Sequence, residues 1–131
     1  MFSFDDFAQL HFLEGYWKGT SADGTEFYEQ YDRPEPGMFR SRRFPDEAFD
    51  QHTDGSHITF QDGEVRSTWG EFTWRATRIG KDFADFEPVN APSHFSWRRV
   101  DESTLEALQR WQAEGKEQQH TIRMTKITRI V

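Results

Sequence analysis

Cysteine is absent from this sequence. Its absence excludes disulfides, thiolate zinc sites, iron–sulfur clusters and cysteine nucleophiles. Long apolar runs are missing as well: no stretch approaches the roughly 18 residues that a membrane helix needs. No basic segment followed by an apolar one resembles a leader peptide. We therefore expect no membrane-spanning helix and a cytoplasmic location.

Basic residues are outnumbered by acidic ones. The chain holds 16 lysines and arginines against 23 aspartates and glutamates, which gives a net charge of −7. A negative chain is repelled by phosphate backbones and by anionic lipid surfaces. The charge balance thus predicts neither nucleic acid nor a membrane as a partner.

Aliphatic side chains are few, with four leucines, four valines and five isoleucines, whereas the chain has 13 phenylalanines and five tryptophans. Disordered chains are poor in aromatic residues, and here the rings are spread over the whole length. A chain of 131 residues can bury a core without metal ions or disulfides. We predict a single domain over residues 1–131 with a core built from rings.

Residues 4–13 have the pattern of one short helix. Phe4, Phe7 and Leu10 recur at helical spacing, and acidic side chains stand in the first turn, where the helix dipole favours them. Ser3 is placed to cap the first turn, and Gly15 ends the pattern. We expect no further helix.

From residue 16 onward the pattern is that of a β-protein. Short stretches rich in aromatic and β-branched residues alternate with turn sequences such as Asp62-Gly63, and no segment offers the helical crossover that parallel strands need. So many antiparallel strands would leave exposed edges unless the sheet closed. We therefore predict an all-β, antiparallel up-and-down β-barrel of about 8–10 strands with one short N-terminal helix. The candidate strands cover residues 16–20, 26–32, 38–44, 56–61, 64–70, 72–79, 82–87, 94–100, 103–112 and 119–130, and residues 45–55 are predicted to form a mobile loop at one barrel mouth.

A Gly-x-Trp motif ends the segment Phe12-Leu13-Glu14-Gly15-Tyr16-Trp17, directly after the helix. With Glu29-Gln30-Tyr31, the Met38 to Arg43 stretch and the Phe86 to Trp97 stretch, it resembles the lipocalins and their calycin relatives, in particular small bacterial lipocalin-like domains of uncharacterised function. The resemblance implies a lipocalin-like barrel around a small cavity. It also implies that Trp17 lies across the closed end, under a basic residue of the last strand, Arg123 or Arg129.

Alternation along the strands brings one charged pair inward. Phe27, Glu29 and Tyr31 share one face of their strand, and Phe39 shares a face with Arg43. If the apolar members face the interior, the carboxylate and the guanidinium enter with them and must pair. The alternative is that the opposite faces point inward and both charges are solvated.

The ligand-binding residues predicted from the sequence combine this pair with Tyr31, one further arginine and three tryptophans. Arg99 alternates with Trp97 and is a second candidate for an interior guanidinium that engages an acidic head group. Trp69, Trp74 and Trp97 can line a pocket for a planar or fatty ligand. The same rings can instead fill a barrel that has no room left.

Catalytic and metal motifs are weak. No Gly-x-Ser-x-Gly elbow or phosphate-binding loop occurs, so no catalytic residue is predicted. A small barrel enzyme stays an alternative, because acid–base catalysis needs only one or two groups in a cavity. His52, Asp54 and His57 have the composition of a metal site but stand in a predicted loop, so no metal is expected. His120 alternates with apolar residues that are expected to face inward, so an alternative is that it binds haem iron, as in the nitrobindins. No other cofactor is predicted.

The leading interpretation is a barrel that binds a small hydrophobic or amphipathic ligand. This ligand has an acidic head group if Arg43 or Arg99 engages it. A small barrel enzyme or a haem protein is one alternative. A filled barrel that serves protein contacts is another, and a homodimer stays open.

Overall fold

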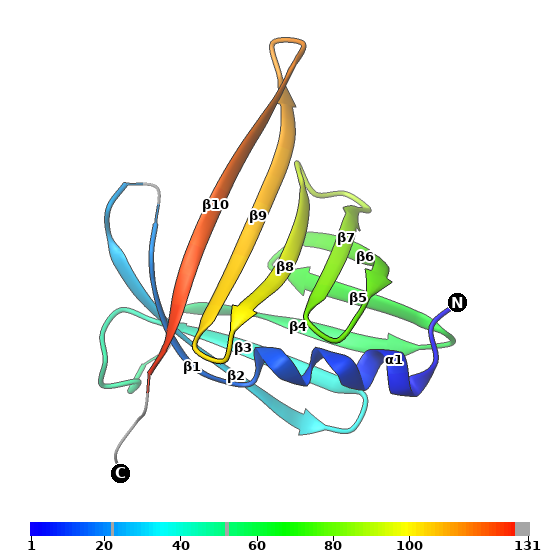
Figure 1. The fold of residues 1–131 in the computed structure, drawn as a ribbon, viewed down its shortest axis with the longest axis horizontal. Helices are drawn as coiled ribbons and strands as arrows, with labels where there is room; N and C mark the ends of the chain where they lie inside the picture. The colour runs from blue at the N-terminus through cyan, green and yellow to red at the C-terminus, as the bar shows by residue number, and fades with distance from the viewer. Residues whose placement is uncertain (22, 52, 128–131) are drawn as a thin grey trace.

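The computed structural model describes residues 1–21, 23–51 and 53–127 and contains a closed barrel of ten antiparallel strands (Figure 1). Each strand pairs with its neighbours in the chain, and the last strand closes the barrel on the first. This confirms the predicted all-β up-and-down barrel. The elements are α1 (Phe4–Ala8), a 3-10 turn η1 (Gln9–Leu13), β1 (Gly15–Thr20), β2 (Glu26–Glu35), β3 (Met38–Phe44), β4 (Asp54–Gln61), β5 (Glu64–Trp69), β6 (Phe72–Ile79), β7 (Phe83–Pro88), β8 (His94–Asp101), β9 (Thr104–Ala113) and β10 (Lys116–Ile127).

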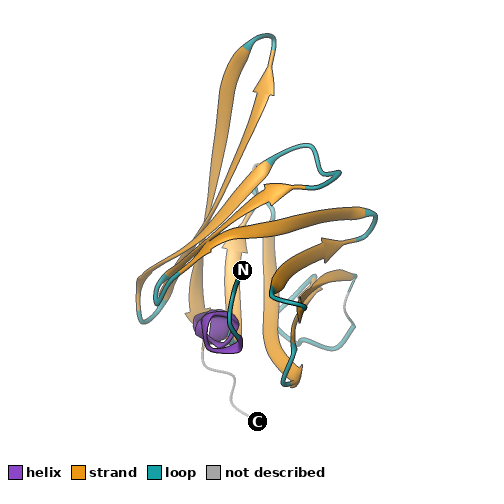
Figure 2. Cartoon of the chain, turned by 90° about the vertical axis from the view of Figure 1, so that its right-hand side faces the viewer, coloured by secondary structure: helices purple, strands orange, loops and turns teal. Residues whose placement is uncertain are grey.

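The N-terminal helical segment lies along one end of the barrel (Figure 2). Ser3 caps α1 in a reciprocal capping box with Asp6, as the sequence predicts. Phe7 and Leu10 are fully buried in the core, where the Phe7 ring packs 5.0 Å from the ring of Phe39. Burying two such side chains ties the helix to the barrel and closes this end. Neither α1 nor η1 is long enough to cross a membrane, and the described residues contain no other helix.

Trp17 lies at this closed end. Its indole N–H donates to the Leu13 carbonyl oxygen at 2.8 Å, which connects β1 to the helical segment. The cation over its ring is the ammonium of Lys126, 5.6 Å from the ring centroid, whereas Arg123 donates to Glu106 on the exterior. Lys126 faces Trp17 directly across the β1–β10 ladder, and an odd-numbered neighbour such as Arg123 points to the other face. Arg129, the other candidate, lies outside the described residues.

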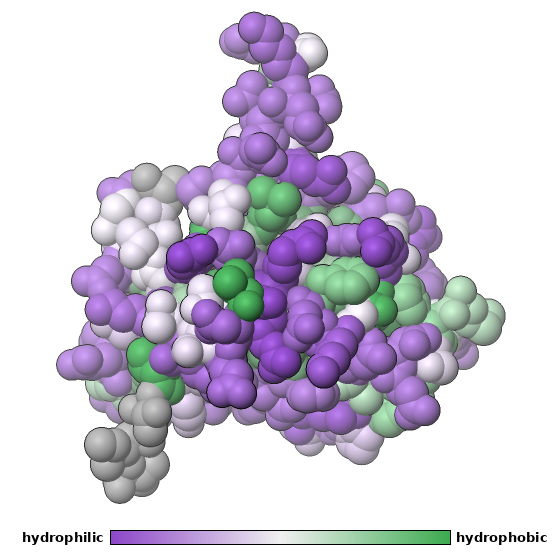
Figure 3. Space-filling model, viewed as in Figure 1, coloured by the Kyte–Doolittle hydropathy of each residue, from purple (hydrophilic) through white to green (hydrophobic). Residues whose placement is uncertain are grey.

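The β9–β10 hairpin extends well beyond the other strands (Figure 1). Strand β10 pairs with β1 only from Met124 to Ile127, while its pairing with β9 begins at Lys116. The strand therefore starts three residues before the predicted start at 119. Sequence alternation missed the start of β10 because residues 116–119 are all polar and exposed, and Figure 3 shows the projecting tip as hydrophilic on the face in view.

Part of the connection between β3 and β4 packs on the outside of the barrel. Phe49, in this connection, is buried against the rings of Tyr16, Tyr28 and Phe44, at centroid distances of 4.8, 5.9 and 5.0 Å. These three rings occupy the strand positions that alternate with the inward-facing residues, so the loop covers the outside of β1, β2 and β3. Phe49 anchors this part of the predicted loop to the outer face of the barrel, and its place at a barrel mouth stays a prediction.

Candidate functional site

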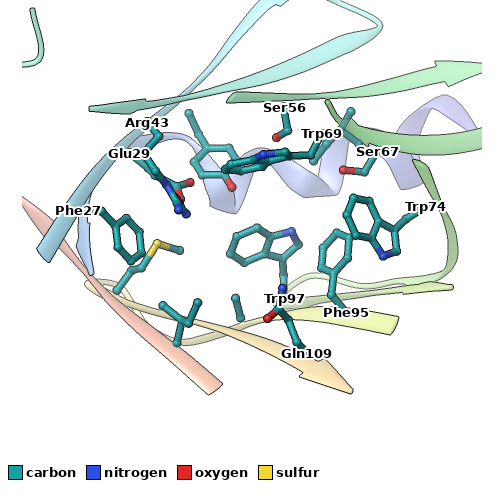
Figure 4. A pocket seen from close by; sticks show the side chains of 15 residues that line it. Phe27, Glu29, Arg43, Ser56, Ser67, Trp69, Trp74, Phe95, Trp97 and Gln109 are labelled. Carbon is teal, nitrogen blue, oxygen red and sulfur yellow. Dashed lines mark hydrogen bonds and ion pairs between the residues drawn. The ribbon is translucent and has the colours of Figure 1, made fainter. Parts of the chain in front are cut away.

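A cavity of about 120 Å³ lies inside the barrel, away from the helical end (Figure 4). Its walls are mostly aromatic and aliphatic, with one charged pair and a few hydroxyl and amide groups. Six of the seven residues that the sequence predicts at a ligand site line it, and Arg99 does not. The lining residues are Phe27, Glu29, Tyr31, Arg43, Ser56, Ile58, Ser67, Trp69, Trp74, Phe95, Trp97, Ala107, Gln109, Ile122 and Met124.

Glu29 and Arg43 face each other directly across the β2–β3 ladder and both point inward. The Arg43 Nε donates to Glu29 Oε1 at 3.1 Å, and Nη2 makes a shorter hydrogen bond to the same oxygen. Glu29 is only 2% exposed, so its charge depends on this partner. The interior pair follows the alternation in the sequence, and the solvated alternative is wrong.

The guanidinium of Arg43 also lies between two rings. Its central carbon is 4.2 Å from the ring centroid of Phe27 and 4.9 Å from that of Trp69. Cation–π contacts of this kind stabilise a cation that has lost part of its water. Arg43 is thus held by a carboxylate and two rings, and Figure 4 shows this group at one end of the cavity.

The other end of the cavity is an aromatic wall. The Phe95 ring meets Trp74 edge-on at 5.1 Å and Trp97 edge-on at 6.0 Å. The Trp74 indole N–H donates to the Ser93 carbonyl oxygen at 2.7 Å, which fixes that ring at the β8 side of the barrel. Trp97 lies between this wall and the charged pair (Figure 4). Edge-to-face packing of this kind is a favourable arrangement of aromatic rings and holds the wall together.

Tyr31 lies beside Glu29 on the same face of β2 and is buried. Its ring meets Trp97 edge-on at 5.7 Å. Burial, and then the negative charge of Glu29, raise the pKa of the Tyr31 phenol well above its ordinary value. The phenol is therefore a neutral hydroxyl on the cavity wall at any ordinary pH.

Two buried polar atoms of this wall have no hydrogen-bond partner among the described residues. They are Oε2 of Glu29 and Nε1 of Trp97. Leaving a buried polar atom unpaired costs about 1–3 kcal/mol, more for a charged group. Both side chains line the cavity, and buried polar atoms in folded proteins normally have a partner.

Arg99 points away from the cavity. Its Nε donates to Asp82 at 2.9 Å, and its backbone N–H donates to the Asp82 carbonyl oxygen. The β8–β9 ladder is regular from Trp97 to Arg99, which pairs with Leu105, so the alternation holds, but Arg99 stands near the end of β8 and its side chain pairs with Asp82. The predicted interior role of Arg99 is therefore not supported by its position.

His120 does not line the cavity, although it is partly buried and its Nε2 atom has no partner among the described residues. A porphyrin is far larger than a cavity of about 120 Å³, which is below the volume of ordinary cofactor sites. The residues present do not fit a haem. The described residues contain no cluster of metal-ligating side chains, and His52 of the loop candidate lies outside them.

Several lining residues were not singled out from the sequence. Ser67 alternates with Trp69 on β5, and Gln109 faces Phe95 across the β8–β9 ladder. Ile122 and Met124, which alternate with His120 along β10, line the cavity as their alternation predicts. The signal for Ser67 and Gln109 was the strand period, but their polar side chains did not mark them as wall residues.

Comparisons with known proteins add little to this geometry. No family model matches the sequence, and no curated protein matches it. Among solved structures, the chain is similar to a redesigned beta barrel, at 13% identity and a TM-score of 0.43. That match covers 89% of this chain and 93% of the other. A similarity this distant says nothing about function.

Proposed function

We propose that this protein is a lipocalin-like binding barrel whose interior holds one small, flat and mostly apolar molecule. The observation that carries the proposal is the cavity of about 120 Å³, walled by tryptophan and phenylalanine rings around a single charged pair. Ligand pockets commonly combine apolar walls with a few placed polar groups. A barrel that served only protein contacts would have no need of such a space.

The size of the cavity limits the guest. Drug-sized ligands occupy about 300–1,000 Å³, and an apolar cavity of about 150 Å³ accepts benzene. A cavity of about 120 Å³ therefore fits a molecule of one ring with few substituents. The long acyl chain of a fatty acid is not a suitable guest in this arrangement of side chains.

Titration of the purified protein with toluene and with phenol, followed by calorimetry, tests the proposal. A matched pair of variants on one strand controls for loss of stability. Ala107→Leu places a larger side chain in the cavity wall, while Ala113→Leu makes the same change near the tip of the projecting hairpin. We expect the wild type and Ala113→Leu to bind at least one of the probes, and Ala107→Leu to bind it at least about tenfold more weakly.

Binding that survives in Ala107→Leu with unchanged affinity contradicts the proposal, and so does a wild type that binds neither probe. If Ala107→Leu does not fold, Ser67→Leu supplies a second obstruction from another strand, because Ser67 is buried and lines the same cavity. Native mass spectrometry of the protein as purified is an independent check. A non-covalent adduct that is lost on denaturation and absent from the blocked variant supports the proposal.

A further inference from the structure

We propose that the cavity selects an uncharged ligand that donates a hydrogen bond to Glu29 and accepts one from Trp97. This inference rests on the proposed function and names the class of molecule that the site takes. The expected guest is a small aromatic compound with both an N–H or O–H donor and an acceptor atom, such as a phenol or an aromatic amide. Neither an ionised carboxylic acid nor a pure hydrocarbon has this combination.

The first support is the pair of unpaired atoms. Glu29 Oε2 can only accept while the side chain is ionised, and Trp97 Nε1 can only donate. Both side chains are more than nine-tenths buried and both line the cavity. The pairing that each lacks defines a ligand with one donor and one acceptor. Figure 4 shows both side chains around the same space.

The second support is the state of Arg43. Two of its nitrogen atoms donate to a single oxygen of Glu29, and the rings of Phe27 and Trp69 cover the guanidinium. An anionic head group would lie beside the carboxylate of Glu29 in a site with little water, where like charges repel strongly. A cationic head group would meet the guanidinium in the same way. An uncharged ligand leaves the internal ion pair intact.

Four probes of one ring separate these possibilities. Toluene and phenol have nearly the same shape and differ in the donor, whereas benzamide and benzoate have nearly the same shape and differ in charge. An apolar cavity without polar demands prefers toluene, because the phenol hydroxyl must leave water. We expect the reverse here, with phenol bound about tenfold more tightly than toluene and benzamide about tenfold more tightly than benzoate.

Substitution of the two side chains assigns the preferences. In Glu29→Gln the charged acceptor is lost and Arg43 is left without its carboxylate, so the advantage of phenol should shrink and benzoate should gain relative to benzamide. Trp97→Phe keeps a ring but removes the donor, so benzamide should lose affinity more than toluene does. Trp111→Phe is the matched control, since Trp111 stands on the projecting hairpin and does not line the cavity.

The indole N–H resonance of Trp97 gives a second readout. Trp97→Phe identifies it among the resonances of the five tryptophans by its disappearance from the spectrum. A downfield shift of this resonance with phenol and benzamide, and none with toluene, is the expected result. The measurement needs no assumption about affinity.

The outcomes distinguish the inference from the function on which it rests. If none of the four probes binds, the proposed function fails. If toluene binds as tightly as phenol, or benzoate as tightly as benzamide, the cavity is a binding site but the donor–acceptor selection is wrong. An unchanged preference for phenol in Glu29→Gln overturns the role given to Glu29.

Discussion

At the scale of single residues, the interior of this barrel depends on one carboxylate. Glu29 enters a wall made of rings, and its charge is compensated by Arg43 from the adjacent strand. Taking two charges out of water is costly, and their attraction offsets the cost only when both partners are present. The pair is therefore a position where a single substitution should cost more stability than the double substitution.

Arg43→Leu should destabilise the protein more than the double change Glu29→Gln with Arg43→Leu, because the single change leaves a buried carboxylate without its partner. Loss of one member of a buried pair costs about 3–5 kcal/mol. The side chain of Arg43 is 29% exposed, so we expect about 2 kcal/mol for the single variant. Urea melts of the wild type, both single variants and the double variant give the coupling energy, and strictly additive losses would contradict burial of the pair.

Tyr31 gives a pH dependence with a definite sign. Its pKa in the folded protein lies above that of an unfolded tyrosine, because burial and Glu29 disfavour the phenolate. Above pH 10 the unfolded chain therefore releases this proton while the folded protein keeps it, and the free energy of unfolding falls as the pH rises. The decline approaches about 1.4 kcal/mol per pH unit from this group.

Comparison with Tyr31→Phe isolates the contribution of the Tyr31 phenol to the pH dependence of the free energy of unfolding. Urea melts between pH 9 and pH 11 should show a shallower loss of stability for Tyr31→Phe than for the wild type. Absorbance titration should show one tyrosine of the wild type that ionises later than the others and is missing from the variant. Equal slopes for the two proteins would mean that Tyr31 is solvated.

Alternation along β2 and β3 predicted Glu29 and Arg43, because an inward charge between inward rings has to find a partner. Arg99 could not be predicted in this way. Its ion pair with Asp82, near the end of β8, depends on how β7 and β8 lie side by side and not on the local sequence. The unpaired Trp97 N–H is likewise visible only once the neighbouring groups are placed.

At the scale of elements, the ladder between β3 and β4 is unusually tight. A Cβ atom at Gly55 would lie 2.1 Å from the Ser41 carbonyl oxygen, a backbone atom that cannot turn away. Arg42, Arg43 and Ser41 of β3 all pair along this stretch, so the strand that carries Arg43 depends on the close approach. Glycine is needed here for space and not for a special dihedral angle.

Gly55→Ala should force the two strands apart and destabilise the protein by about 2 kcal/mol, within the range of overpacking. Gly37→Ala is a matched control, because the nearest atom to its added Cβ is the Phe60 carbonyl oxygen at 3.8 Å. The control should change the stability by less than about 0.5 kcal/mol. Chemical denaturation of both variants decides the matter, and equal effects would refute the close approach of β3 and β4.

At the scale of the whole molecule, the barrel has a closed end and an extended one. The helical segment, Trp17 and the buried phenylalanines close one end, while the β9–β10 hairpin projects from the other side of the barrel (Figures 1 and 2). Two strands alone are only marginally stable in water. Local stability should therefore vary along these two strands.

Hydrogen exchange measures this variation. Amides near the hairpin tip, from Gln112 to Gln118, pair only within the hairpin and should exchange through local opening of low free energy. Amides of Met124 to Ile127, which pair with β9 or β1 in the body of the barrel, should be protected by nearly the full free energy of unfolding. Equal protection along all of β10 would show that the projecting part is held by a further contact.

The sequence by itself determined the β-rich class, the capped helix, the Asp62-Gly63 hairpin and the inward pair of Glu29 and Arg43. Each follows from local chemistry: strand alternation, a side-chain cap, a turn that needs positive φ, and the cost of a lone buried charge. Only the tertiary structure decided the volume left in the barrel, the position of Arg99 and which cation covers Trp17. These depend on ladder register and on how side chains from distant strands pack against one another, which no local stretch of sequence specifies.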